Sequence, residues 1–394
     1  MNVQKSVEKT EEVAEEDEWT AAQEEQAQQA FEQSFAQYYI YNLTRTFAVA
    51  LFHLSTFSSS LCLSTLSVLP PPHQSTSLSL SLIARAHYEV QDYRSSERAF
   101  KALRWKERYR VWDMEVYSSL LWQMGRGVEL AFLAREMVDL APGSGEAWIV
   151  VGNLFSVRKE RERALGCFRR ATELAGRGSV KAYAYTLCGH ESLDEDLGSA
   201  IRYFERALRV EGGRHYNAWY GLGTCYLRMG KVRMAEYHFR RAVGVNGGSA
   251  VLLGCVGLAV ERRAGEGAVE EALGWFERAV EVSEGRNALV RFRRAKIYVK
   301  LRRYQASVRY IYFIGLVAKV LWLQEAIEDL EYLKNATPDE SNVIFQLAKV
   351  YRLVGDVVKS AQMMAAARDV SPKSVGKIRR LVEVEAETME VDPS

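Results

Sequence analysis

The stretch HYNAWYGLGTCYLRMGKVRMAEYHFRRAV, from His215 to Val243, has a spacing of large and small residues that fits neither one smooth amphipathic helix nor an alternating strand. A tryptophan, a glycine and a tyrosine occupy fixed places in its first half, and two alanines flank a phenylalanine in its second half. These positions are Trp219, Leu222, Gly223 and Tyr226, followed by Ala235, Phe239 and Ala242. The spacing predicts two short helices that pack against each other, with the small residues at their contacts.

The same spacing recurs along the chain, and it is the pattern of the tetratricopeptide repeat. Clear units share a large residue, a small residue three or four positions later, and a following alanine. Besides the unit at Trp219, they start at Trp148, Tyr185 and Ile344, with weaker units near Leu253 and Arg291 and degenerate ones at 83–100 and 114–142. Because several offsets recur together in several units, the repeat is a specific signal.

One unit of this kind cannot bury its apolar face alone, so neighbouring units must stack. The sequence therefore predicts an all-α fold, a right-handed superhelical solenoid of tetratricopeptide helix pairs. Small residues let the paired helices approach each other closely, and aromatic residues fill the space between them. The residues expected to pack the repeats are Trp148, Gly152, Ala164, Gly189, Ala200, Trp219, Gly223, Tyr226, Ala235 and Phe239.

Composition divides the chain into three parts. Residues 1–37 contain ten acidic residues and two lysines, which predicts either disorder or a solvated helix. Residues 38–82 are rich in Ser and Leu, and no charged residue occurs from Thr46 to Ala84. Residues 83–393 carry the repeat array.

The uncharged segment allows three interpretations. Thr46–Leu69 is long enough to span a bilayer, but nine of its 24 residues are Ser or Thr, which disfavours a membrane helix. It lies too far from the start of the chain for an ordinary signal peptide. The segment also resembles translated intron sequence, and sequencing the spliced transcript tests that hypothesis.

A second anomaly lies at 307–324, between the two helices expected for the unit at Arg291. The offset from Arg291 to Ala326 exceeds the repeat spacing by 19 residues. The inserted sequence is apolar but too short to cross a bilayer. It allows the same hypothesis of retained intron.

Charge and motif content exclude several functions. The chain of 394 residues has 52 basic and 50 acidic residues, a balance that gives no support for nucleic-acid binding. Its five cysteines and six histidines show no metal-ligand spacing, so we expect no metal and no cofactor. No nucleophile motif, phosphate loop or zinc-protease motif is present, so we expect no enzyme.

Four stretches match more than a generic repeat: RYRVWDMEVYSSLLWQM, SGEAWIVVGNLFSVRKERERALGCFRRA, AYAYTLCGHE and RHYNAWYGLGTCYLRMGKVRMAEYHFRRA. They resemble the carboxy-terminal repeat array of the third subunit of the anaphase-promoting complex, of the Cdc-twenty-seven or Nuc-two type. The resemblance covers about residues 83–393. It implies a non-catalytic scaffold subunit of a ubiquitin ligase that acts in mitosis, in nucleus and cytoplasm.

The resemblance also implies partners. In that family the array binds the Ile-Arg tails of coactivators of the Cdc-twenty and Fizzy-related type and of the Doc-domain subunit, beside contacts with other subunits of the complex. The family's amino-terminal array forms a homodimer, and that array is missing here, so homodimerisation of this chain is doubtful. The alternative function is a tetratricopeptide adaptor of another complex. This adaptor would be anchored in a membrane through Thr46–Leu69 if that segment spans the bilayer.

The first helix of each unit lines the concave groove of such a solenoid, which gives candidates for a peptide site. Glu146 or Glu191 would meet the arginine of an Ile-Arg tail, and Asn153 and Asn217 would meet its carboxylate or backbone. Tyr220 would form part of the pocket for the isoleucine side chain. The full set of groove candidates is Glu146, Ile149, Asn153, His190, Glu191, Asn217, Tyr220 and Thr224.

Overall fold

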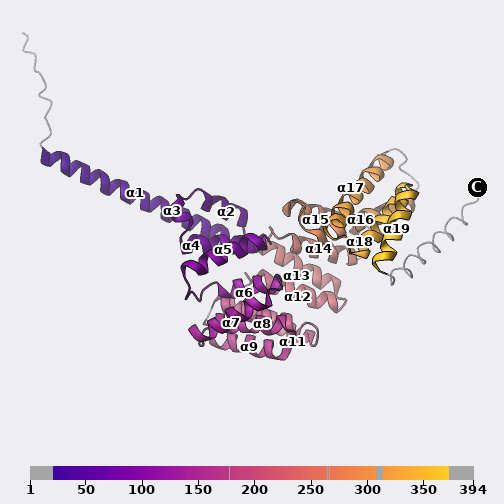
Figure 1. Ribbon diagram of the computed structural model, residues 1–394. Helices are drawn as coiled ribbons and strands as arrows, with labels where there is room; N and C mark the ends of the chain where they lie inside the picture. Colours follow the sequence, from indigo (N-terminus) through magenta and orange to yellow (C-terminus); the bar gives the residue numbers. More distant parts are fainter. Residues whose placement is uncertain (1–20, 177, 264, 266, 308–313, 372–394) are drawn as a thin grey trace, which may run out of the picture.

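The computed structural model describes residues 21–371 except 177, 264, 266 and 308–313, and it describes their side chains outside Ala21 and 302–322. Within these ranges the regular structure consists of helices α1 to α19, without a strand (Figure 1). The prediction of an all-α, right-handed solenoid of tetratricopeptide helix pairs is confirmed.

The sixteen helices from α4 onward form pairs in which each helix packs against the next. Their bounds are α4 Ser77–Glu89, α5 Tyr93–Lys106, α6 Met114–Gln123, α7 Gly127–Leu140, α8 Gly145–Val157, α9 Arg161–Leu174, α10 Ser179–Ser192, α11 Leu197–Val210, α12 Tyr216–Arg228, α13 Val232–Val245, α14 Ala250–Arg263, α15 Ala268–Val282, α16 Ala288–Ser307, α17 Ile314–Ala336, α18 Ser341–Val354 and α19 Val357–Val370.

Local sequence signals fix where several of these helices begin and end. The side chain of Ser144 accepts the backbone N–H of Ala147 and caps α8, and Asp196 caps α11 through Gly198. Between α12 and α13 the chain turns at Gly230, whose φ of +75° suits glycine and strains other residues. These turns are short, so consecutive helices must lie antiparallel and side by side.

In the units at Trp148 and Trp219 the glycine faces the phenylalanine of the same unit, whereas the unit at Ile344 has Ala348 at the glycine position. A Cβ on Gly152 would lie 2.3 Å from the ring of Phe168, and one on Gly223 would lie 2.5 Å from the ring of Phe239. Both rings are buried. The glycines therefore make room for an aromatic ring, whereas the sequence had suggested room for a neighbouring backbone.

The first alanine of the second helix is fully buried in three units, at Ala164, Ala200 and Ala235. In the unit between those at Trp148 and Trp219, a Cβ on Gly189 would lie 2.6 Å from the ring of Phe204. The tryptophans are half-buried and fix the preceding turn: Trp219 Nε1 donates to the carbonyl of Gly213 at 2.8 Å, and Trp148 makes the equivalent bond to Pro142. Tyr226 lies parallel to the imidazole of His238, with ring centroids 5.0 Å apart.

Three helices precede the array: α1 Ala21–Ser55, α2 Ser59–Ser67 and α3 Pro71–Gln74. Residues 21–37 form the exposed first half of α1, which projects away from the rest of the molecule (Figure 1). The candidate span Thr46–Leu69 is divided between α1 and α2 by a turn at 56–58. Among the residues described, no helix combines the length and the apolar character that crossing a membrane requires.

The helices α1 and α2 pack on α4 through a small apolar core. Its buried members are Ala50, Cys62, Leu66, Leu69, Leu82 and Ala86. The segment 38–82 thereby continues the stack at its amino-terminal end.

Only part of the anomalous segment 307–324 lies within the described residues. Positions 308–313 are outside them, and α17 begins at Ile314 and continues into the second helix of the pair. Asp329 of α17 is 1% exposed and connects α17 to α16. It accepts a hydrogen bond from Arg291 at 3.2 Å and one from Arg294 at 2.9 Å.

The curvature of the solenoid brings its first unit against its fifth. The hydroxyl of Tyr216, at the start of α12, donates to Glu89 at the end of α4 at 2.8 Å, across 127 residues of sequence. The groove is therefore bounded on both sides by helices of this chain.

Candidate functional site

Two cavities lie in this groove and share part of their walls. One has a volume of about 490 Å³ and the other about 630 Å³. Five residues line both of them: Tyr88, Gln123, Tyr183, Asn217 and Tyr220. The two cavities are thus parts of one site, and we call them the acidic cavity and the paired cavity from the character of their charged groups.

The acidic cavity is the smaller of the two, and the carboxylates of three glutamates from different helices line it. Glu89 closes α4, Glu115 lies in the first turn of α6, and Glu211 caps α11. Glu89 accepts the hydroxyl of Tyr216, and Glu211 lies 2.9 Å from Nδ1 of His215. Both therefore have a partner on the cavity wall.

Glu115 differs from these two because it is buried without a counter-ion in contact. Its side chain lines the cavity, and its buried Oε2 has no hydrogen-bond partner among the described residues. Burial, with a smaller effect of the nearby Asp113 carboxylate, raises the pKa of Glu115 to about 7. A cation that enters the cavity would stabilise the ionised form of this buried carboxylate.

The pKa of Glu89 is also raised by burial, although its bond from Tyr216 acts in the opposite direction. Arg85 lies on the same wall, but it contacts Asp113 at 3.3 Å. The cavity therefore combines two desolvated carboxylates with aromatic walls, an arrangement that suits a guanidinium or ammonium group.

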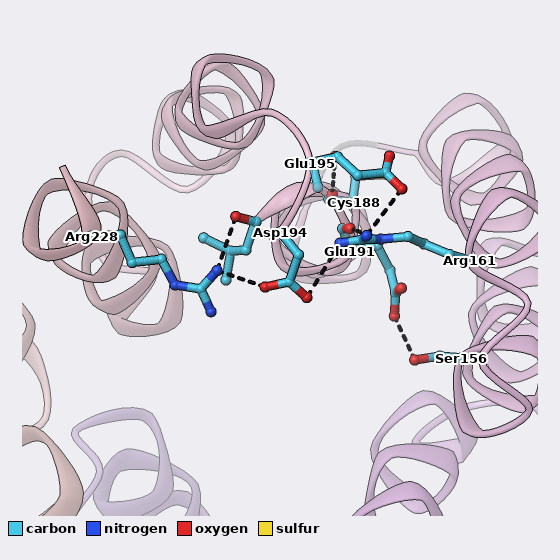
Figure 2. A network of polar contacts seen from close by, with 9 residues as sticks. Ser156, Arg161, Cys188, Glu191, Asp194, Glu195 and Arg228 are labelled. Carbon is cyan, nitrogen blue, oxygen red and sulfur yellow. Dashed lines mark hydrogen bonds and ion pairs between the residues drawn. The ribbon is translucent and has the colours of Figure 1, made fainter.

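In the paired cavity the carboxylate of Asp194 is matched by two arginines and that of Glu191 by a serine (Figure 2). Arg161 contacts Glu195 at 3.0 Å and Asp194 at 3.4 Å, and its Nε donates to the carbonyl of Glu191. Arg228 donates to Asp194 at 2.6 Å. The carboxylate of Glu191 accepts the hydroxyl of Ser156. A cationic ligand gains less here than at Glu115, because it must compete with these contacts.

The structure gathers five of the eight groove candidates in the site. Asn153, His190, Glu191, Asn217 and Tyr220 all line the paired cavity. Asn217 and Tyr220 line the acidic cavity as well. These five positions on the first helices of their units therefore face a common cavity.

Asn153 is not available as a donor to a ligand carboxylate. It is buried, and its Nδ2 donates to the hydroxyls of Ser118 and Ser119 at 2.8 and 3.1 Å. These bonds use both amide hydrogens. Asn153 therefore joins α8 to α6. Asn217 makes no such bond to the described residues and stays a candidate donor.

The other three candidates lie elsewhere. Ile149 is fully buried and packs with Ala171 and Ala184 between neighbouring helices, so no surface remains for a ligand. Glu146 and Thr224 are half-buried but line neither cavity, and the hydroxyl of Thr224 donates to the carbonyl of Tyr220. For Ile149, a rotation of one residue on the helix changes a groove position into a packing position.

His190 is an aromatic element of the wall. Its ring lies edge-on to Phe204 and 6.2 Å from the ring of Tyr220. Burial, with a smaller effect of His215, lowers the pKa of His190 to about 4. The imidazole is therefore neutral at physiological pH and offers a hydrogen bond without charge.

Glu89 and Glu115 were missed by the sequence reasoning. They belong to the two degenerate units, in which the pattern is too weak to show the groove-facing positions. Glu89 also reaches the site only through the curvature of the solenoid, which no local pattern encodes. Within the described part of the chain, no group of three His, Cys, Asp or Glu side chains could hold a metal ion.

The stacked helix pairs and the enclosed groove define a tetratricopeptide-repeat solenoid. No protein-family model matches the chain. It is 35% identical over 311 residues to anaphase-promoting complex subunit 3 of Schizosaccharomyces pombe, which covers 79% of this chain and 43% of the relative. It is 33% identical over 333 residues to cell division cycle protein 27 homolog B of Arabidopsis thaliana, which covers 84% and 41%. Over most of its length the chain is similar to anaphase-promoting complex subunit 3, as its motifs indicated.

The chain spans about two-fifths of the length of these curated relatives. Among solved structures, a chain from the crystal structure of the APC/C hetero-tetramer Cut9-Hcn1 matches with a TM-score of 0.60 at 15% identity. The match covers 79% of this chain and 56% of that one. At this identity the likeness concerns the fold.

Proposed function

We propose that this chain is a non-catalytic scaffold subunit of the anaphase-promoting complex, and that its groove binds peptide tails ending in Ile-Arg. The ligands would be the tails of coactivators of the Cdc-twenty and Fizzy-related type and of the Doc-domain subunit. Ubiquitination of mitotic substrates would be carried out by the partners, in nucleus and cytoplasm. The relationship to subunit 3 and the groove support this proposal.

One observation carries the proposed arginine site: in the acidic cavity, the buried Oε2 of Glu115 has no hydrogen-bond partner among the described residues. An arginine side chain supplies a charge and several N–H donors to a buried carboxylate. Glu89 lies on the same wall and would take the remaining donors. We therefore propose that the arginine lies in the acidic cavity, away from Glu146 and Glu191.

The terminal carboxylate of the tail needs donors close to that site. Asn217 lines both cavities, at the start of α12. Arg214 precedes it on the wall of the acidic cavity and is exposed. We assign the carboxylate to these two side chains.

The test is a titration of a labelled peptide ending in Ile-Arg against the full chain, with a peptide ending in Ile-Ala as the control ligand. A hydrogen bond to a charged group contributes about 1.5–3 kcal/mol, so Glu115→Gln and Asn217→Ala should each weaken binding roughly tenfold or more. The matched control is Glu146→Gln, which changes a carboxylate that lines neither cavity and should not weaken binding.

Equal affinity for the two peptides would remove the arginine site. A loss with Glu146→Gln but none with Glu115→Gln would place the arginine at Glu146, as the sequence had suggested. Thermal melting of each variant separates lost binding from lost fold.

A further inference from the structure

Two side chains that belong to no repeat unit line the acidic cavity. Leu54 lies in the last turn of α1, and Phe57 lies in the turn between α1 and α2. Both are half-buried. The segment before the array thus contributes directly to the wall of the site.

Phe57 is held against the fifth unit across the groove. Its ring packs edge-on against that of Tyr216, with centroids 4.9 Å apart and an interplanar angle of 85°. The hydroxyl of the same Tyr216 donates to Glu89. The ring of Phe57 and the carboxylate of Glu89 therefore both contact the side chain of Tyr216.

The backbone at Phe57 is unusual for so large a residue. Its φ is +57°, in the left-handed region that glycine normally occupies at the end of a helix. The turn is closed by the bond from the N–H of Ser58 to the carbonyl of His53 at 2.8 Å. A phenylalanine in this conformation is strained, and such strain persists where the side chain is held by its surroundings.

Other apolar groups face the same space from the repeats. Val180 of α10 and Val251 and Leu252 of α14 line the acidic cavity together with Leu54 and Phe57. The cavity thus has an apolar part beside the carboxylates of Glu89 and Glu115. A ligand that fills both parts carries an apolar side chain next to a cationic one.

We infer that Leu54 and Phe57 form the subsite for the apolar residue that precedes the terminal arginine of the ligand. This inference rests on the proposed function, because it assumes that the arginine lies at Glu115 and Glu89. The turn between α1 and α2 then determines which residue is accepted beside the arginine.

The experiment measures the affinities of the full chain for two peptides, one ending in Ile-Arg and one ending in Ala-Arg. Phe57→Ala removes the ring and keeps a side chain in the strained conformation, whereas Phe57→Gly removes the ring and relieves the strain. Phe52→Ala is the matched control, because Phe52 is exposed on α1 and lines no cavity of the site.

Both variants of Phe57 should weaken binding of the Ile-Arg peptide by roughly tenfold, the effect of about 50 Å² of lost apolar contact. Binding of the Ala-Arg peptide should change less than about twofold, since it lacks most of that contact. Phe52→Ala should bind both peptides as the wild type does.

Three results would overturn the inference. Tighter binding of both peptides by the Phe57 variants would show that the turn covers the cavity. Equal losses for both peptides, or no change, would show that Phe57 does not contact the residue before the arginine. If the wild type binds neither peptide, the proposed function fails and the inference fails with it.

Discussion

Gly223 shows how a single residue sets the distance between two helices. Its missing side chain leaves space for the ring of Phe239, which is 1% exposed. A methyl group there would lie 2.5 Å from the ring, well inside van der Waals contact. Gly223→Ala should therefore destabilise the fold by about 1–3 kcal/mol, measured by denaturant unfolding.

The control for Gly223→Ala is Gly244→Ala in α13. A Cβ on Gly244 meets no atom within 4 Å, so alanine should stabilise that helix by about 0.5–1 kcal/mol. If both substitutions shifted stability in the same direction, the contact between Gly223 and Phe239 would not explain the glycine.

The raised pKa of Glu115 predicts how the stability of the folded chain depends on pH. Its pKa is raised by burial from the ordinary 4.5 to about 7, so the unfolded chain loses this proton at lower pH than the folded chain. Glu115 therefore makes stability fall as pH rises from about 4.5 to 7, and the full cost is present above 7. Glu115→Gln removes this cost and should raise the unfolding free energy at pH 8 by at most about 3 kcal/mol.

Unfolding of wild type and Glu115→Gln at pH 4.5 and at pH 8 checks this sign. The gain from Glu115→Gln should be present at pH 8 and small at pH 4.5. A gain of the same size at both values would mean that the carboxyl does not titrate differently in the folded protein. The same variant is expected to bind the Ile-Arg peptide less well, which would place Glu115 in the site at a cost in stability.

At the scale of the element, the pair α16–α17 depends on a buried ion network. Asp329 is 1% exposed, and two arginines of α16 bond to it. Asp329→Asn leaves these arginines without their counter-charge and should cost about 3 kcal/mol, because they can turn only partly toward water. Hydrogen exchange should show the loss of protection first in α16 to α19.

Asp339→Asn is the comparison for this substitution, since Asp339 is exposed in the turn before α18. It should change stability by less than about 0.5 kcal/mol. If Asp329→Asn also left the unfolding free energy unchanged, the stability of the α16–α17 pair would come from apolar packing alone.

At the scale of the whole molecule, the repeat spacing was enough to predict the fold class. The units at Trp148, Tyr185 and Trp219 each carry a glycine and an alanine at positions where only small residues fit, as Gly152 and Ala164 show, and these constraints are local in sequence. The three-dimensional site was only partly predictable. Asn217 and Tyr220 line both cavities, and their groove-facing position was predictable because they belong to a clear unit.

Glu89, Glu115 and Phe57 could not be found in this way. The first two lie in degenerate units, and the third lies outside the array. They meet the fifth unit because the solenoid curves, as the bond between Tyr216 and Glu89 shows. Curvature is the sum of small rotations between units, and a single sequence does not display it.

We propose that the acidic cavity receives the arginine of a peptide tail. The most direct measurement is a double-mutant cycle between the ligand and the cavity at pH 8. Affinities of peptides ending in arginine or in its neutral analogue citrulline are measured with the wild type, with Glu115→Gln and with Glu89→Gln combined with Glu115→Gln. We predict that citrulline weakens binding to the wild type at least about tenfold and weakens binding to the double variant much less, a coupling of about 1 kcal/mol or more. An equal effect of citrulline on all three proteins would contradict the account.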